Sequence, residues 1–140
     1  MKFHILMELK DEPLGGGNQF LKALKKEAQK NDSYSENLED AQLILFNSHH
    51  NPIKVLEARK KYSDHIFVHR VDGPMSYRGK NGKRLDQKIF YINNLVADGT
   101  VFQSEWSRRQ TIQENHKFSL KNQVIQNAPD PKIFFKKNLK

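Results

Sequence analysis

The sequence predicts an α/β protein built on a doubly wound, mainly parallel sheet of about five strands. Apolar runs of strand length alternate along the chain with segments whose apolar residues recur at helical spacing. Residues 65–104 contain a strand, a long polar loop, a helix and a second strand, which is the pattern of a βαβ unit with a right-handed crossover. A chain of 140 residues is long enough for one domain with a core and too short for two ordinary domains.

The N-terminal part predicts one strand and one helix. Residues 2–9 are rich in apolar side chains and precede a run of charged residues and a proline, so we expect the first strand there. Three glycines then lead into a helix for which Asn18 is the expected N-cap. The apolar stripe of this helix recurs at helical spacing and consists of Phe20, Leu21, Leu24 and Ala28.

The middle of the chain continues the alternation. Residues 41–46 predict the second strand, and Pro52 suits the first turn of a helix that continues to about Tyr62. Residues 65–71 predict the third strand. The next helix is indicated by apolar residues at spacings of four, three and four, namely Leu85, Ile89, Ile92 and Val96.

The C-terminal part predicts a strand at residues 99–104, a helix at 105–116 and a short last strand at 122–126. We expect one domain over residues 1–128. Residues 129–140 contain two prolines and a basic end, which fits both a linker to a further domain and an open tail.

Composition limits the classes of partner. The chain has 24 Lys and Arg against 16 Asp and Glu, a formal net charge of +8, which favours anionic partners. Without cysteine it has neither disulfides nor thiolate metal sites. No apolar run approaches the length of a spanning helix, and the start does not have the pattern of a signal peptide, so a cytoplasmic location is expected.

Two kinds of anionic surface are considered for this charge. Lys22, Lys25, Lys26 and Lys30 share one side of the first helix and could hold the chain peripherally to an anionic inner membrane face. A solvated helix face is the favoured interpretation, because the helix has no exposed apolar wedge to insert into a membrane. Nucleic acid is not an expected partner, because the basic residues fall mainly in loops and helices instead of alternating with aromatic residues on strands.

The functional site is expected where the strands end, because parallel sheets bind ligands beyond the carboxyl ends of their strands. His69, Arg70, Asp72 and Ser104 all lie at such ends. Asp72 could bind an acceptor hydroxyl or begin the turn that contains Gly73.

Metal binding is not expected. His49 and His50 follow the second strand and His69 ends the third, yet the chain lacks the spacings that typify histidine metal sites. A neutral imidazole can both donate and accept hydrogen bonds, so His69 is suited to a polar ligand.

The glycine run and a basic loop each allow two interpretations. The amides of Gly15, Gly16 and Gly17 could approach an anion at a helix N-terminus, or the run could be a plain flexible turn. Its spacing is not that of dinucleotide-binding loops, so no NAD site is inferred. Residues 77–84 hold four basic side chains, which fits a solvated loop or a clamp on an anionic acceptor, and Arg108 extends the positive face.

An ordered series of segments resembles the N-terminal half of a family 4 glycosyltransferase of the GT-B type. The series is GGGNQF, LILFNSHHN, HRVDGP with a following YRG, TVFQSEWS and VIQNAPDPKIF, and it covers nearly the whole chain. The most specific part is HRVDGP together with ADGTVFQSEWS. The resemblance implies a Rossmann-like domain, one half of a fold in which two such domains face each other across a cleft.

The resemblance also implies a function. In this family the N-terminal domain chiefly holds the acceptor, the C-terminal domain holds the nucleotide-sugar, and a sugar passes to an acceptor hydroxyl with retention of configuration. No cofactor or metal is expected beside the nucleotide-sugar donor. The expected acceptor is a sugar or a glycolipid. His69 and Asp72 are the expected catalytic residues, and the expected donor- or acceptor-binding residues are Gly15, Gly16, Gly17, Gln19, His49, Arg70, Gly73, Ser104 and Arg108.

The chain ends where the donor-binding half would begin, so we expect it to be inactive alone and to need that half, which could be a domain on another chain. The alternative is a basic module that binds an anion or a nucleic acid without catalysis.

Overall fold

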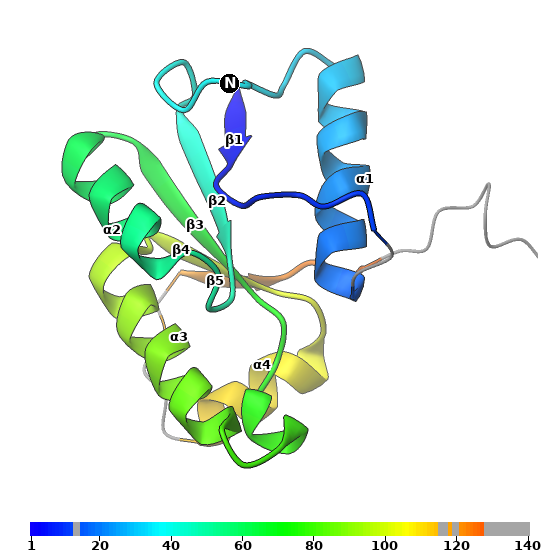
Figure 1. The fold of residues 1–140 in the computed structure, drawn as a ribbon, viewed down its shortest axis with the longest axis vertical. Coiled ribbons are helices and arrows are strands. Elements are labelled where there is room, and N and C mark those ends of the chain that lie inside the picture. The colour runs from blue at the N-terminus through cyan, green and yellow to red at the C-terminus, as the bar shows by residue number, and fades with distance from the viewer. Residues whose placement is uncertain (13–14, 115–117, 119–120, 128–140) are drawn as a thin grey trace, which may run out of the picture.

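The computed structural model describes residues 1–12, 15–114, 118 and 121–127. It confirms the predicted α/β class: five parallel strands form one open sheet in the order β1-β2-β3-β4-β5, with helices on both faces (Figure 1). The strands are β1 (Phe3–Ile5), β2 (Leu43–Asn47), β3 (Ile66–Val71), β4 (Gly99–Phe102) and β5 (Asn122–Val124). The helices are α1 (Gly16–Lys30), α2 (Pro52–Lys61), the 3-10 turn η1 (Met75–Arg78), α3 (Gly82–Val96) and α4 (Glu105–Gln113).

The two faces of the sheet have separate cores. Successive strand residues point to opposite faces, and β2 shows this clearly. Leu45 packs with Leu21 of α1, whereas Ile44 packs with Val55 of α2 and Val96 of α3. Figure 1 shows α1 on one side of the strands and α2 and α3 on the other. A third cluster, of Val71, Ile89 and Phe102, closes the α3 face near the carboxyl ends of β3 and β4.

The strand order has a topological consequence. Consecutive parallel strands that advance steadily across a sheet have crossovers of the same hand only when their helices share a face. Phe3 also pairs in parallel with Tyr34: the Phe3 amide donates to the Ser33 carbonyl at 3.0 Å and the Ser35 amide donates to the Phe3 carbonyl at 2.9 Å. The alternate residues of β1 bond to β2, so Tyr34 and β2 lie on opposite sides of β1. The chain therefore passes from β1 through α1 to one side of β1 and then crosses to β2 on the other side, and the order reverses where the helices change face, as in a doubly wound sheet.

The N-terminal elements differ in detail from those predicted. β1 spans only Phe3–Ile5, and the chain beyond it runs as a loop toward α1. The prediction that Asn18 caps the first helix is wrong, because α1 begins at Gly16 with Gly15 in the N-cap position and no side-chain cap. The Asn18 side chain instead accepts from the Lys10 amide at 3.0 Å and donates to the Lys10 carbonyl at 2.8 Å. It thereby ties this loop to the helix.

Residues 77–84, predicted as a basic loop, instead comprise the end of η1, a three-residue turn and the start of α3. The buried Asp86 carboxylate accepts hydrogen bonds from the amides of Met75 and Ser76, at 2.7 and 2.8 Å. A Cβ on Gly82 would lie 2.0 Å from the Met75 carbonyl oxygen. The first turn of α3 therefore lies against the backbone of η1, which only glycine permits.

Replacing Gly82 by alanine is expected to destabilise the chain by about 3 kcal/mol, the upper end of the cost of overpacking. The clash is with backbone, so no side chain can move to relieve it. Urea unfolding followed by circular dichroism measures the effect. Gly16→Ala is the matched control, because nothing lies within 4 Å of a Cβ there, and it should be neutral or slightly stabilising. Equal stabilities of the two variants would contradict the packing of η1 on α3.

Candidate functional site

A cleft of about 420 Å³ lies at the carboxyl edge of the sheet. Its walls are the loop after β1 with the start of α1, the loop after β2, and η1, and its floor is formed where β2, β3 and β4 end. The lining residues are Met7, Glu8, Lys10, Gly15, Gly16, Gly17, Asn18, Asn47, Ser48, His49, His50, Asp72, Met75, Arg78 and Gln103. The cleft thus lies at the edge of the sheet where the sequence predicts the functional site.

Arg70 organises the floor of the cleft. Its side chain is 2% exposed, and its guanidinium donates to the Asn47 amide oxygen at 2.7 Å and to the Asp72 carboxylate. Its second terminal nitrogen, Nη2, donates to the side-chain oxygens of Gln103 at 3.4 Å and of Asn127 at 3.3 Å. The centroid of the Phe20 ring lies 4.7 Å from the guanidinium carbon. A guanidinium with this many partners has little capacity left for a ligand, so Arg70 acts on the cleft through its neighbours.

Asp72 is positioned by its backbone as well as by its carboxylate. Its carbonyl oxygen accepts from the Gln103 amide and, at 2.7 Å, from the Ser107 hydroxyl. One carboxylate oxygen faces Arg70, and the other lies 3.5 Å from the Cβ position of Gly17. The side chain is 19% exposed and lines the cleft. Asp72 therefore has an accessible carboxylate oxygen that can accept a hydrogen bond from a hydroxyl group.

His69 lies on the opposite face of β3 from Arg70 and does not line the cleft. Its ring is completely buried and stacks on Phe46 at 4.3 Å. Nε2–H donates to the Ser48 carbonyl at 2.9 Å, and Nδ1 accepts from Asn93 at 3.1 Å, which fixes the neutral tautomer. Burial lowers the pKa of His69 to about 4. The direct sugar contact that the resemblance implies has no counterpart in this geometry, and His69 is instead a positioning residue.

What His69 positions is the loop after β2. Ser48 has a φ of 48°, a left-handed conformation that non-glycine residues seldom adopt. Its amide donates to the Arg70 carbonyl at 2.8 Å and its carbonyl accepts from His69, so both sides of the unusual residue are held. His49 and His50 follow directly, line the cleft, and stack at 4.7 Å.

Of the other predicted residues, the three glycines line the cleft and four residues do not. Gln19 is exposed on α1, because the helix begins two residues before the expected cap and Asn18 takes the inward position. Ser104 is the N-cap of α4 and accepts from the Ser107 amide at 3.0 Å. Arg108 donates to Asn122 at 2.7 Å and so ties α4 to β5. Gly73 lies against Ser107: a Cβ added at Gly73 would lie 3.3 Å from the Ser107 hydroxyl oxygen.

Several lining residues were not predicted. Asn47 and Gln103 end β2 and β4, so the rule that placed Arg70 and Asp72 at the carboxyl edge could also have found them. Asn18 and Arg78 could not have been selected by that rule, because their inward direction depends on where α1 and η1 begin.

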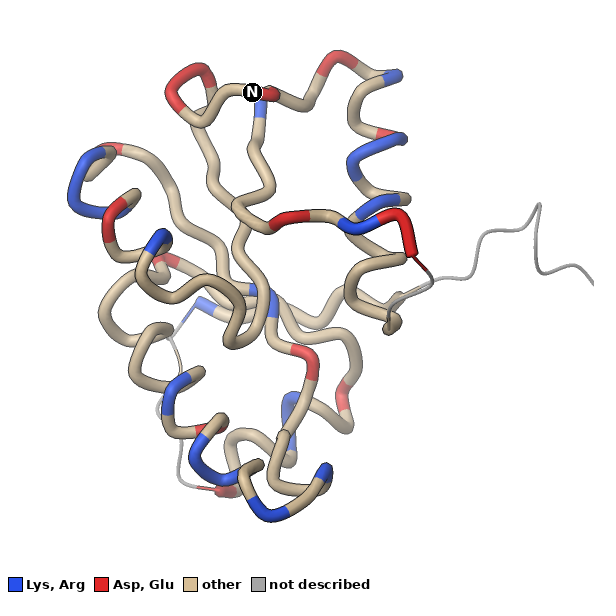
Figure 2. Tube along the Cα trace, in the orientation of Figure 1, with Lys and Arg blue, Asp and Glu red and all other residues tan. Residues whose placement is uncertain are grey.

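The basic face of α1 is largely paired with acidic side chains. Three of the four lysines expected to face a membrane form ion pairs: Lys22 with Asp11 at 3.0 Å, Lys25 with Glu36 at 2.8 Å, and Lys30 with Glu27 at 2.6 Å. Figure 2 shows acidic residues beside α1 and a second basic region around η1 and the start of α3. In the described ranges no helix has the length and apolar character needed to cross a membrane. The same part of the chain holds no group of three or more His, Cys, Asp or Glu side chains placed to bind a metal ion.

Comparison of the chain with protein-family models, with curated proteins and with solved structures finds no match.

Replacing Arg70 by methionine is expected to cost about 3 kcal/mol of stability, because it removes a buried charge and leaves the buried Asn47 amide oxygen and the partly buried Asp72 carboxylate without this donor. Arg59→Met is the matched control. Arg59 also binds a carboxylate, Asp98 at 3.1 Å, but those side chains are 29% and 39% exposed, and the expected loss is about 1 kcal/mol. Urea denaturation compares them, and a loss from Arg70→Met no greater than that from Arg59→Met would refute the central role of Arg70.

His69 should make stability depend on pH. Its pKa is about 4 when folded against a usual 6.5, so the unfolded chain binds more protons between these values and stability falls as pH falls. From pH 7 to pH 4.5 this residue should account for a loss of about 2 kcal/mol. The measurement is urea unfolding at both values for the wild type and His69→Gln, which should lack this part of the loss. His50→Gln, a change on an exposed ring, should keep the wild-type dependence.

Proposed function

We propose that this chain is the acceptor-side domain of a retaining glycosyltransferase that uses a nucleotide-sugar. The observation that carries the proposal is the cleft at the carboxyl edge of the sheet, in which the glycine run, the loop after β2 and the Asp72 carboxylate lie on facing walls. The order of these segments is also what gives the sequence its resemblance to family 4 enzymes.

The lining of the cleft suits a polyhydroxylated ligand. Asp72 accepts hydrogen bonds, and the half-buried His49 beside Ser48 can donate or accept them. Burial lowers the pKa of His49 most, and the neighbouring His50 lowers it further. Both effects favour the neutral form of the His49 ring. The three glycines line the cleft, and a Cβ at Gly15 or Gly16 would have nothing within 4 Å, so a ligand could approach this part of the backbone. These groups recognise hydroxyls by direction instead of by charge.

The arrangement of the cleft also agrees with the expectation that this chain is inactive alone. The cleft is bounded by elements of one domain, and the donor phosphates would need a second wall to be oriented for attack. Asn127 donates to Gln103 at 3.1 Å and accepts from Arg70, so the chain after β5 passes the floor of the cleft. A donor-binding half that follows or joins at this point would face the acceptor.

Binding of glycosides to the cleft tests the proposal without requiring turnover. In a titration of the isotope-labelled chain with a panel of simple glycosides, we expect amide shifts at Gly16, Gly17 and His49, with saturation in the millimolar range. Asp72→Asn should weaken the binding about tenfold, the cost of one charge-assisted hydrogen bond. Asp64→Asn, on an exposed carboxylate, is the control.

Two outcomes would reject the acceptor role. The first is that no glycoside of the panel shifts the amide signals of the cleft residues, while an oligonucleotide does shift them. That result would favour the basic binding module. The other is glycoside binding that Asp72→Asn does not weaken. Incubation of the chain alone with nucleotide-sugars should yield no product above the blank.

A further inference from the structure

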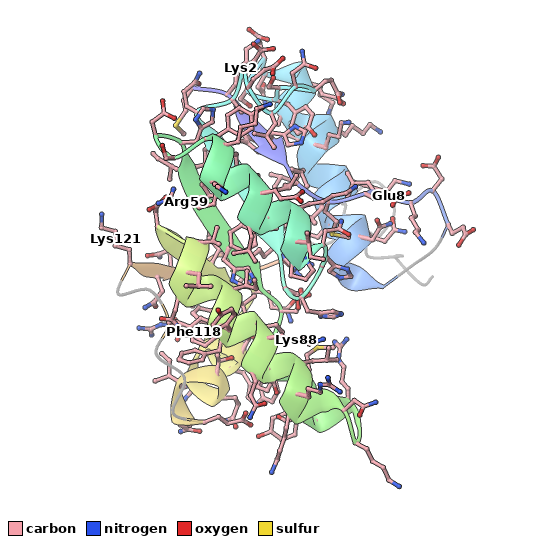
Figure 3. The ribbon with its side chains drawn as sticks, turned by 60° about the vertical axis from the view of Figure 1, so that its left-hand side comes forward. Lys2, Glu8, Arg59, Lys88, Phe118 and Lys121 are labelled. Atoms are coloured by element: carbon pink, nitrogen blue, oxygen red, sulfur yellow. The ribbon has the colours of Figure 1, made fainter. Side chains whose placement is uncertain are left out.

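Two neighbouring helices on the sheet face opposite α1 carry exposed apolar side chains. Figure 3 shows α2 and α3 side by side, and Val55 of α2 and Ile92 of α3 belong to one buried cluster. The exposed apolar residues of this pair are Ile53, Leu56, Tyr91 and Leu95, which are 70%, 37%, 61% and 51% exposed. None of the four lines the cleft at the carboxyl edge. A single exposed apolar residue needs no explanation, whereas a contiguous group rimmed by polar residues marks an interaction site.

The exposed apolar residues of α2 lead toward α3. The Arg59 guanidinium binds the Asp98 carboxylate at 3.1 Å, and Asp98 lies just beyond the end of α3. The side of α2 that carries Arg59 is therefore the side toward α3. Leu56 lies one turn before Arg59, and Ile53 lies one turn before Leu56. This row runs from solvent at Ile53 to the α3 side at Arg59, with Leu56 between them.

The exposed apolar residues of α3 lie on its flank toward α2. Phe90 follows a buried residue and contacts Phe118, whose ring also contacts Phe102 of β4. That flank of α3 is turned toward β4 and away from α2. Tyr91 and Leu95 each precede a buried residue, so they lie on the opposite flank, next to α2. The residues that form this shared surface, the α2–α3 face, are Ile53, Leu56, Tyr91 and Leu95.

Basic side chains extend the α2–α3 face at both ends. Lys60 lies one turn beyond Leu56 on α2. On α3, Lys88 lies one turn before Tyr91, and Arg84 lies one turn before Lys88. Both helices return against the direction of the parallel strands, so Lys60 marks one end of the face and Arg84 the other. These three basic residues are exposed, and none forms an ion pair with another described residue.

Acidic side chains do not balance this charge. α2 carries four basic residues and α3 carries three, against one acidic residue on each helix. The acid of α3, Asp86, is buried and accepts from the backbone amides of η1. The acid of α2, Glu57, is exposed, and Asp98 beside the helices is bound to Arg59. The α2–α3 face therefore has an apolar centre and a positive rim.

We infer that the α2–α3 face binds an amphipathic helix of a partner protein, which has an apolar stripe and carboxylates near both ends. The rise from Arg84 to Leu95 is about 16 Å, so a partner helix of about three turns covers the face. Its apolar stripe would pack along the seam of α2 and α3, and its carboxylates would meet the unpaired basic ends. Four apolar side chains offer a small contact area, so the complex is weak and reversible.

Charge and shape argue against other occupants of the face. A second copy related by twofold symmetry would bring the same basic ends together. Residues 128–140 contain four lysines against one aspartate, so the basic rim would repel them as well. An anionic bilayer has the complementary charge, but Leu56 is largely covered between the helices. A flat bilayer would meet the longer basic side chains first, whereas a helix can lie along the seam.

Two synthetic peptides test the inference. The probe is a peptide of about three turns with leucines at spacings of three and four residues and glutamates at both ends. The control peptide has lysine in place of each glutamate. In titrations of the isotope-labelled full chain, the acidic peptide should bind saturably and shift the amide signals of Leu56 and Leu95. The basic peptide should bind at least about tenfold more weakly.

Two pairs of variants locate the binding site. Lys88→Glu should weaken binding of the acidic peptide about fivefold, because an exposed attraction becomes a repulsion. Lys26→Glu, on an exposed residue of α1, should stay within about twofold of wild type. Leu95→Ser should weaken binding about tenfold through the lost apolar contact. Ile112→Ser, on a comparably exposed residue of α4, should again stay within about twofold. Circular dichroism checks that each variant is folded.

The inference is overturned if the acidic peptide does not bind saturably, if both peptides bind equally, or if the control variants weaken binding as much as Lys88→Glu and Leu95→Ser. A dimer in sedimentation that Leu95→Ser dissociates would assign the face to a second copy and would also overturn it. So would pelleting with anionic vesicles that Lys88→Glu and Leu95→Ser abolish. None of these results bears on the proposed function, because the α2–α3 face and the cleft have no residue in common.

Discussion

The buried guanidinium of Arg70 is the interaction on which the carboxyl edge of this sheet depends. A charge removed from water is tolerated only when it is paired and its donors are satisfied. Arg70 meets that condition with the ends of β2 and β4, the start of the loop after β3, and Asn127 beyond β5. Each of these segments is therefore held at a defined position relative to the others, and the floor of the cleft is the surface they share.

His69, the residue before Arg70, likewise holds neighbouring segments in position, but on the other face of the sheet. Because side chains alternate along a strand, His69 points into the α3 core while Arg70 points toward α1. His69 holds the carbonyl of Ser48 and the backbone of Arg70 holds its amide. Two consecutive residues of β3 thus fix the left-handed turn that aims His49 and His50 into the cleft, and the turn could not relax without loss of a buried hydrogen bond.

The sequence predicted the fold class and the edge at which the cleft lies, because apolar periodicity and the rule for parallel strands both act locally. It did not predict which polar residues would face the ligand. His69 and Arg70 look equally suited to a site as neighbours at a strand end, and only their partners on β2, α3 and β4 separate a buried support from an accessible group. The N-cap of α1 lies three residues before the predicted position, at Gly15 instead of Asn18, and it is Asn18 and not Gln19 that lines the cleft.

The position of the cleft follows from the point at which the chain reverses its direction across the sheet. In a doubly wound sheet the crevice opens where neighbouring loops leave toward opposite faces, which usually coincides with a reversal of strand order. Here the chain passes from β1 through α1 to the Phe3–Tyr34 bridge on one side of β1 and then crosses to β2 on the other side. The loop after β1 leads to α1 on one face, and the loop after β2 leads to α2 on the other. The loops part between β1 and β2, and Gly15–Gly17 and Ser48–His50 become opposite walls. The cleft therefore lies at the switch point of the sheet, where helices on opposite faces are compatible with crossovers of the same hand.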